Sequence, residues 1–319
     1  MATYLITGVA GFVGSHIAEA LIARGDRVLG FDNLSTGKRE NVPKGVDFIV
    51  GDLADASAVE RVCLGVDAIF HLAALPSVPR SVKNPRPSHV SNLDGTFNLL
   101  EGARAAGVGR VLYASSSSVY GNQPGFPRVE TMLPQPIAPY PAQKLAGETY
   151  MQSYARVYGM ETVCLRYFNI FGPRQRADSP YSGVLAKFAL QMMRPDQERP
   201  TIQGDGEQGR DFTYVDNVVS ANLLALAAPA EKVAGQVFNV ACGEHHTLNE
   251  AYKLLARYTG YNEPPLYSEP RAGDVRNSLA DIGAAREAFG YEPLIDFSEG
   301  LRRTVSWFRE HFEASTHKL

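Results

Sequence analysis

The stretch TYLITGVAGFVGSHIAEAL (residues 3–21) decides the fold of this chain. Five β-prone residues (3–7) lead directly into three spaced glycines, Gly8, Gly11 and Gly14, and then into a segment of helical period. Glycines at a strand-to-helix turn permit a tight bend and let backbone N–H groups approach a phosphate at the positive end of the helix. The stretch therefore predicts a βα unit whose turn can hold a pyrophosphate.

The rest of the first half repeats this alternation of short apolar runs and helical segments. Helical period is clearest at 12–25 and 92–107. The apolar runs after the first are 27–31, 46–50, 67–72, 110–115 and 162–168. Strands that are apolar at nearly every position and separated by helices indicate a parallel sheet covered on both faces.

The alternation stops after about residue 169. Shorter strands and helices are mixed there with loops rich in Pro and Gly, such as GPRQRADSPYSG (172–183) and YNEPPLYSEPRAGD (261–274). We predict two lobes, 1–168 and 169–319, that exchange some chain and pack directly against each other. The cleft between them should lie at the carboxyl ends of the strands.

The bulk composition excludes several classes of protein. Lys and Arg number 31 against 34 Asp and Glu, so the net charge of -3 implies no general attraction to nucleic acid or to an anionic membrane. The longest apolar run, ANLLALAA (221–228), is shorter than the roughly 18 residues that span a bilayer. Cys63, Cys164 and Cys242 are far apart and lack metal-ligand spacing, so we expect reduced cysteines, no metal, and a cytoplasmic protein.

Acidic residues follow the second and third predicted strands. Asp32 stands 18 residues after Gly14, close to the spacing at which a carboxylate binds the adenosine ribose of a dinucleotide. A carboxylate there repels a 2′-phosphate, so the sequence favours NAD over NADP. Asp52 and Leu53 follow the next strand, where an adenine ring could lie, although an acidic helix cap would give the same pattern.

Four motifs in fixed order resemble the extended short-chain dehydrogenase/reductase superfamily over essentially the whole chain: TGVAGFVGSH (7–16), HLAAL (71–75), SSSSVYG (115–121) and YPAQK (140–144). The resemblance implies an α/β fold, with a Rossmann-type doubly wound parallel sheet and a smaller C-terminal mixed α/β substrate lobe that binds a sugar nucleotide. It implies NAD as the cofactor. Besides the three glycines, Asp32, Asp52 and Leu53, the cofactor positions that it implies are Phe12, Val13, Asn33, Ser35, Gly37, Leu72, Ala73, Ala74, Asn92, Tyr140, Lys144 and Tyr167.

Tyr140 and Lys144 are the candidate proton-transfer pair. If the segment is helical, a spacing of four places both on one face, and Pro139 and Pro141 suit the first turn of such a helix. A free tyrosine has a pKa of about 10, so we expect the Lys144 ammonium and the charge of an oxidised nicotinamide to lower it. Gln143 stands where the family usually has Ser or Thr.

A serine hydroxyl usually completes this set in the family. Alignment on VYG (119–121) places it at Ser116, with Ser117 as second choice. Its role would be to bind the substrate hydroxyl as that group becomes a carbonyl. Four serines in a row also suit a simple strand-to-loop transition.

Within the superfamily the chain resembles UDP-hexose 4-epimerases, and most of all those acting on UDP-N-acetylglucosamine. The two phosphate charges of a UDP-sugar suit the guanidinium groups of arginines, and the hydroxyls of its uridine ribose suit a carboxylate. In the family, a small residue such as serine at the position of Ser278 admits a 2-acetamido group. The substrate positions implied are Pro76, Ser116, Tyr140, Asn169, Arg210, Arg271, Asp274 and Ser278.

Three other functions and the oligomeric state also have to be considered. A UDP-glucuronate 4-epimerase or decarboxylase would need a cation for the sugar carboxylate, for which Arg80 or Arg174 could serve. A 4,6-dehydratase is disfavoured, because serines stand where its family has Asp and Glu. A non-catalytic NAD-binding regulatory protein would not need the Tyr140 and Lys144 pair. Segments 92–107 and about 141–158 match helices that pair in family dimers, so a homodimer is expected by analogy.

Overall fold

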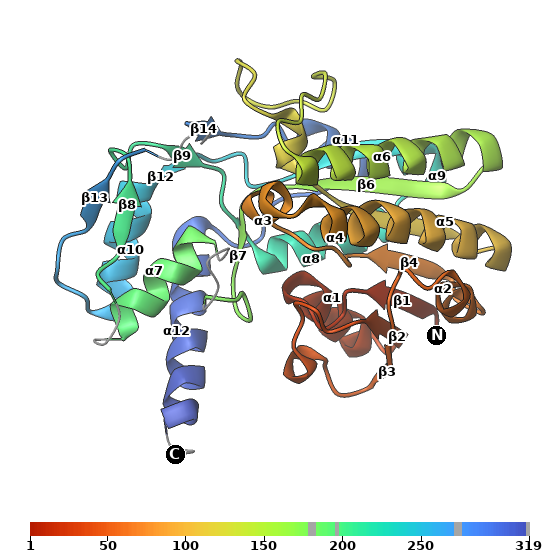
Figure 1. Ribbon diagram of the computed structural model, residues 1–319, viewed down its shortest axis with the longest axis horizontal. Coiled ribbons are helices and arrows are strands. Elements are labelled where there is room, and N and C mark those ends of the chain that lie inside the picture. Colours follow the sequence, from red (N-terminus) through yellow and green to blue (C-terminus); the bar gives the residue numbers. More distant parts are fainter. Residues whose placement is uncertain (178–182, 195–197, 271–275, 317–319) are drawn as a thin grey trace.

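A parallel sheet forms the centre of the protein in the computed structural model, which describes residues 1–177, 183–194, 198–270 and 276–316 (Figure 1). Among these residues the sheet has seven strands in the order β11-β6-β5-β4-β1-β2-β3, and every adjacent pair is parallel. The strands are β1 (Thr3–Thr7), β2 (Arg27–Asp32), β3 (Val46–Val50), β4 (Ala68–His71), β5 (Arg110–Ser116), β6 (Glu161–Tyr167) and β11 (Gln236–Val240).

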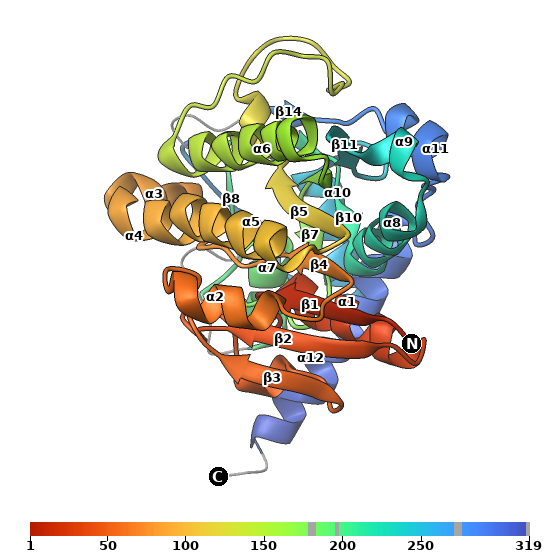
Figure 2. The ribbon, with the colours of Figure 1, turned by 90° about the vertical axis from the view of Figure 1, so that its right-hand side faces the viewer.

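Helices cover both faces of this sheet (Figure 2). One face packs against α1 (Phe12–Ala23), α8 (Val215–Ala227) and α11 (Gly283–Phe289). The other packs against α2 (Ala56–Cys63), α5 (Gly95–Ala106) and α6 (Pro139–Tyr158). The predicted doubly wound α/β fold is confirmed. Each of its six predicted strands is present, and α6 begins at its two prolines as expected.

The chain returns to the sheet after residue 169. β11 pairs with β6 at the sheet edge, and α8 packs beside α1, so part of the second half completes the larger lobe. Short α9 (Ala230–Val233) leads into β11. Division of the chain into lobes 1–168 and 169–319, with chain exchange, stays a prediction.

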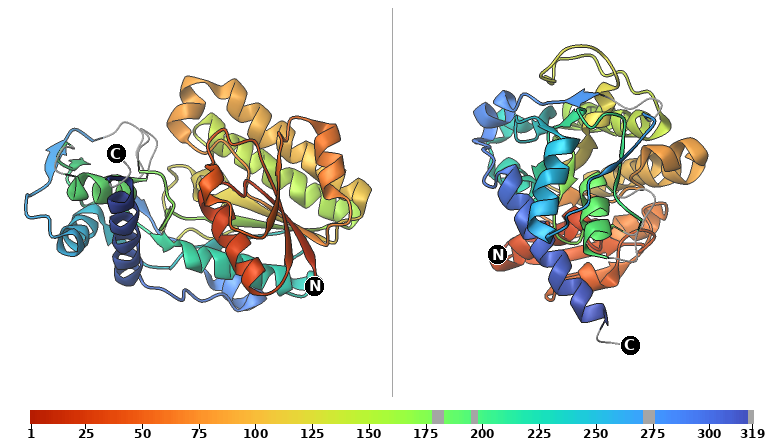
Figure 3. Two further views of the ribbon diagram at one scale, coloured as in Figure 1. Left: turned by 90° about the horizontal axis from the view of Figure 1, so that it is seen from below. Right: turned by 90° about the vertical axis from the view of Figure 1, so that its left-hand side faces the viewer.

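The smaller lobe has its own core to one side of the sheet (Figures 1 and 3). Its helices α7 (Val184–Met193), α10 (Leu248–Thr259) and α12 (Phe297–Thr316) enclose the rings of Phe171, Phe188 and Phe212. Short strands complete it: β7 (Ile170–Phe171), β8 (Thr201–Gln203), β9 (Gly209–Arg210), β10 (Thr213–Tyr214), β12 (His246–Thr247), β13 (Leu266–Ser268) and β14 (Asn277–Ser278).

Several short helical turns lie near the carboxyl edge of the sheet. After β4 come α3 (Val78–Lys83), α4 (Pro85–His89) and the π-helical turn η2 (Val90–Asp94), which leads into α5. The predicted helix 92–107 therefore begins with a π-turn, a feature often found at functional sites. The 3₁₀ turns are η1 (Arg39–Asn41) and η3 (Ser117–Tyr120). No helix in the described ranges combines the length and apolar character needed to cross a membrane.

Candidate active site

The glycine turn after β1 has no room for side chains. Gly8 has a φ of +77°, and a Cβ built there would lie 2.7 Å from the backbone nitrogen of Ala73. A Cβ on Gly14 would overlap the carbonyl oxygen of Gly8. Gly11 precedes α1 and no side chain caps the first turn of that helix. The turn therefore fits a pyrophosphate bound by backbone N–H groups at the positive end of α1.

Asp32 is held at the end of β2 by two backbone N–H groups. Its carboxylate accepts hydrogen bonds from Ala10 at 3.0 Å and from Leu34 at 2.8 Å, which ties it to the glycine turn. Burial raises the pKa of this carboxyl, and the two hydrogen bonds oppose that rise. Nearby, the Asn33 amide donates to Asp52 at 2.9 Å. This arrangement fits the ribose of an adenosine beside the turn.

A cavity of about 510 Å³ extends from the glycine turn to Tyr140. All but one of the predicted cofactor residues line it. The exception, Asn92, is buried behind the cavity wall, where its amide oxygen accepts the backbone N–H of Leu75 at 2.7 Å. The predicted residues on the wall are Gly8, Gly11, Phe12, Val13, Gly14, Asp32, Asn33, Ser35, Gly37, Asp52, Leu53, Leu72, Ala73, Ala74, Tyr140, Lys144 and Tyr167.

Ser116, Tyr140 and Lys144 come together at the far end of this cavity. Ser116 ends β5, and its hydroxyl lies where it favours the ionised form of the Tyr140 side chain. Lys144 is buried one helical turn after Tyr140, and its Nζ donates to the Ala114 carbonyl at 2.8 Å. Ser117 is not among the lining residues, so of the two predicted serines the structure brings only Ser116 to the cavity.

Burial shifts the pKa of both members of the pair. It raises the pKa of Tyr140 to about 12, opposed by the Ser116 hydrogen bond, and lowers the pKa of Lys144 to about 8, opposed by Glu148. The expected lowering of the Tyr140 pKa is therefore wrong for the chain's own groups. The reason is that desolvation disfavours the charged form of each side chain, and no compensating effect of Lys144 on Tyr140 is resolved.

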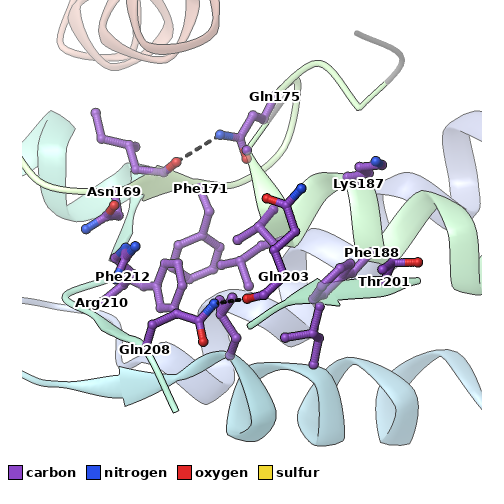
Figure 4. A pocket seen from close by; sticks show the side chains of 16 residues that line it. Asn169, Phe171, Gln175, Lys187, Phe188, Thr201, Gln203, Gln208, Arg210 and Phe212 are labelled. Carbon is purple, nitrogen blue, oxygen red and sulfur yellow. Dashed lines mark hydrogen bonds between the residues drawn. The ribbon is translucent and has the colours of Figure 1, made fainter. Parts of the chain in front are cut away.

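A second cavity of about 580 Å³ lies in the smaller lobe (Figure 4). Asn169 and Arg210 stand at one end of it, and Lys187 and Thr201 at the other. The rings of Phe171, Phe188 and Phe212 and the amides of Gln203 and Gln208 also line it. The two cavities share Asn169, Ile170, Gln175 and Gly183, so they form one elongated site.

The other predicted substrate residues lie in different places. Pro76 is on the wall of the first cavity. Ser278 is half-buried in β14, paired in register with Arg210 of β9, and lines neither cavity. Arg271 and Asp274 lie outside the described residues.

Sequence reasoning missed several wall residues. Thr36, Asn41, Ser77, Ser91 and Arg176 line the first cavity without any motif that distinguishes them. Most of the second cavity was also missed, because its residues come from short strands and loops without a periodic pattern. Ser118 is a further case: its hydroxyl lies 2.8 Å from that of Ser116.

The fold and site together define an NAD-binding enzyme of the short-chain dehydrogenase/reductase kind: a glycine turn under α1, a carboxylate after β2, and a Ser, Tyr and Lys set at the strand ends. The particular family follows from comparison. The model of the NAD dependent epimerase/dehydratase family matches residues 4–241, and the chain belongs to this family.

Relatives with different substrates cover nearly the whole chain. A UDP-glucose 4-epimerase from Thermotoga maritima, solved with UDP-glucose, is 40% identical with a TM-score of 0.93 and covers 97% of this chain and 99% of its own. A UDP-N-acetylglucosamine 4-epimerase from Methanobrevibacter ruminantium, solved with UDP-N-acetylmuramic acid, is 39% identical with a TM-score of 0.91 and the same coverage. A UDP-glucuronate 4-epimerase from Thermodesulfobacterium geofontis is 32% identical and covers 98% of both chains.

These findings confirm the family resemblance, the isomerase class of the UDP-sugar 4-epimerase type, and NAD as the cofactor. The alternative of a non-catalytic regulatory protein is set aside. The chain keeps the Ser116, Tyr140 and Lys144 set inside a cavity that fits the cofactor. Which sugar the enzyme prefers is a separate question.

Proposed function

We propose that the enzyme interconverts UDP-N-acetylglucosamine and UDP-N-acetylgalactosamine through a 4-keto intermediate, and that it also accepts UDP-glucose and UDP-galactose. The observation that carries this proposal is the elongated site. Its first cavity ends at Ser116 and Tyr140, and its second begins at Asn169 and Arg210. A sugar nucleotide lying across the junction would place its sugar at Ser116 and Tyr140 and its nucleoside in the second cavity, while NAD would fill the rest of the first.

We assign the proton transfers to Tyr140 and Ser116. NAD, which the glycine turn and Asp32 would hold, would supply the hydride acceptor and donor for C4. Tyr140 takes the proton of the 4-hydroxyl and later gives it back, while Ser116 hydrogen-bonds to the same oxygen. Lys144, fixed by its bond to Ala114, supplies a positive charge on the Tyr140 face of α6.

We assign the second cavity to the UDP half of the substrate. Arg210 is suited to the diphosphate, and the amide of Asn169 lies where the two cavities meet. Asn169 is fixed there, because its amide donates to the Asp211 carbonyl at 3.0 Å. The amides of Gln203 and Gln208 line this cavity and are suited to the polar edge of a base.

The test is a direct substrate comparison. Purified enzyme with NAD is incubated separately with UDP-N-acetylglucosamine, UDP-glucose and UDP-glucuronate, and inversion at C4 is followed by NMR. We expect the highest kcat/KM with the acetamido sugar and lower turnover of UDP-glucose. Inversion of UDP-glucuronate alone would replace this proposal.

Ser278→Tyr should remove the acetamido activity selectively. A tyrosine adds a large ring beside Arg210 in the β9–β14 pair, and the family precedent is that an aromatic here excludes the 2-acetamido group. We expect kcat/KM for UDP-N-acetylglucosamine to fall about 100-fold and that for UDP-glucose to change by less than about three-fold. Ser268→Tyr, on exposed β13, is the matched control. Equal loss with both sugars would contradict the gating role.

A uronate substrate is the second candidate, since Arg80 and Arg176 line the first cavity. Each of these two arginines already has an interaction within the chain. Arg174 also lines this cavity, where its guanidinium forms an ion pair with Glu19 and lies 3.4 Å from Nδ1 of His16 in α1. Because these arginines already interact with other groups of the chain, we favour the acetamido sugars over the uronate as substrates.

We also propose a homodimer through α5 and α6. Phe97 and Tyr150 contact each other with ring centroids 5.7 Å apart, yet both are exposed, and Val157 and Tyr158 extend the apolar patch. A second copy would cover this patch by two-fold symmetry. Molar mass in solution, compared between wild type and Phe97→Asp, tests this assembly. The cytoplasmic location stays a prediction.

A further inference from the structure

Gln143 is buried between the catalytic helix and the segment before α5. Only 6% of it is exposed, although it stands between Tyr140 and Lys144 in sequence. Its amide lies 2.9 Å from the amide of Asn92 and 3.2 Å from the hydroxyl of Ser88. These partners belong to η2 and α4, and both are almost fully buried. The side chain of Gln143 is therefore not part of a solvent-exposed face of α6.

Asn92 connects Gln143 to the wall of the cofactor cavity. Its amide oxygen accepts the N–H of Leu75 at 2.7 Å, and its amide nitrogen donates to the Leu75 carbonyl at 3.3 Å. Leu75 lies within the loop 72–77, most of whose residues line the cavity. The π-turn η2 places Asn92 so that it can contact the loop on one side and Gln143 on the other.

The first turn of α6 is fixed from the same side. The backbone N–H of Tyr140 donates to the hydroxyl of Ser81 at 3.1 Å, and this hydroxyl in turn donates to the Val78 carbonyl at 2.8 Å. A helix leaves the N–H groups of its first turn unpaired unless another group accepts them. Ser81 thus fixes the backbone of Tyr140, three residues before Gln143, against α3.

We propose that Gln143 is a positioning residue for the epimerase reaction, because it holds Tyr140 and the loop 72–77 in register through Asn92. The inference rests on the proposed function. Buried amides are costly to leave without hydrogen-bond partners, so these contacts restrict how α6 and the loop can shift relative to each other. Gln143 touches neither cavity, and its effect on catalysis passes through the groups that it places.

The test variant is Gln143→Met, which keeps the length of the side chain and removes the amide. We expect kcat to fall about ten-fold to 100-fold while KM for the UDP-sugar stays within about two-fold, since misplacement affects the reacting groups more than UDP binding. Gln152→Met, at a half-buried site farther along α6, is the matched control and should behave as wild type. Gln143→Asn, with an amide one methylene shorter, replaces Gln143→Met if that variant does not fold.

A second measurement does not depend on turnover. In Gln143→Met the backbone amide of Leu75 should exchange with deuterium at least about ten-fold faster than in wild type, without a matching change in α2. Adding Asn92→Leu to Gln143→Met should lower kcat by no more than the worse single variant, since both break one contact chain. Unchanged kcat, or unchanged exchange at Leu75, would overturn the inference. If wild type inverts none of the UDP-sugars, the proposed function fails, and exchange at Leu75 still decides whether Gln143 holds the loop.

Discussion

Tyr140→Phe is expected to lose about 1,000-fold in turnover while it still binds NAD. The change removes one oxygen atom, the Tyr140 hydroxyl, which interacts with Ser116 at the end of the cavity. General acid and base catalysis by one group contributes about 10² to 10⁴ in rate. The hydroxyl of Tyr167, another phenol on this wall, is hydrogen-bonded to the Asn222 amide. NMR of C4 inversion measures the loss, and equilibrium dialysis measures NAD binding.

Two serine variants make this result interpretable. Ser116→Ala should lower turnover less than Tyr140→Phe, because it removes a hydrogen bond and leaves the base. Ser117→Ala, one residue away and off the cavity wall, should resemble wild type. Near-normal turnover by Tyr140→Phe would show that another group carries the proton, and the assignment of Tyr140 would be abandoned.

The first half of the fold could be predicted because its strands are apolar at nearly every position and its helical segments 12–25 and 92–107 have a clear period. β11 could not, since QVFNV (236–240) lies among the irregular elements of the second half and joins β6 across 68 intervening residues. Nothing local distinguishes such a strand from those of the smaller lobe. Its place depends on the packing of α8 against α1, which is a tertiary effect.

Within the site, too, some residues could be predicted from the sequence and others could not. The glycine turn and Asp32 could be predicted, because backbone clearance and charge at a strand end require particular residue types. Gln143 could not be explained from sequence, since its partners Ser88 and Asn92 lie more than 50 residues earlier, on helices whose contact with α6 no periodicity reveals. The rise in the pKa of Tyr140 that burial causes could not be predicted either, because burial of the side chain is not visible in a motif.

Lys144→Met should lose about 100-fold to 1,000-fold in turnover and become more stable to unfolding at pH 7. The rate falls because a preorganised charge beside a developing phenolate typically contributes that much. The stability rises because burial of the ammonium disfavours its charged form. Lowering its pKa from 10.5 to about 8 corresponds to roughly 3 kcal/mol, partly offset by the lost hydrogen bond to the Ala114 carbonyl.

The gain in stability of Lys144→Met over wild type should become smaller as the pH rises. The folded protein releases the Lys144 proton near pH 8, and the unfolded chain near pH 10.5, so the buried charge destabilises the fold fully below pH 8. Between these values the unfolded state holds more protons, so the stability of wild type rises with pH. The advantage of Lys144→Met in denaturant unfolding should therefore be largest at pH 7 and small at pH 10.5. Equal advantage at both pH values would show that packing, and not the buried charge, causes the difference.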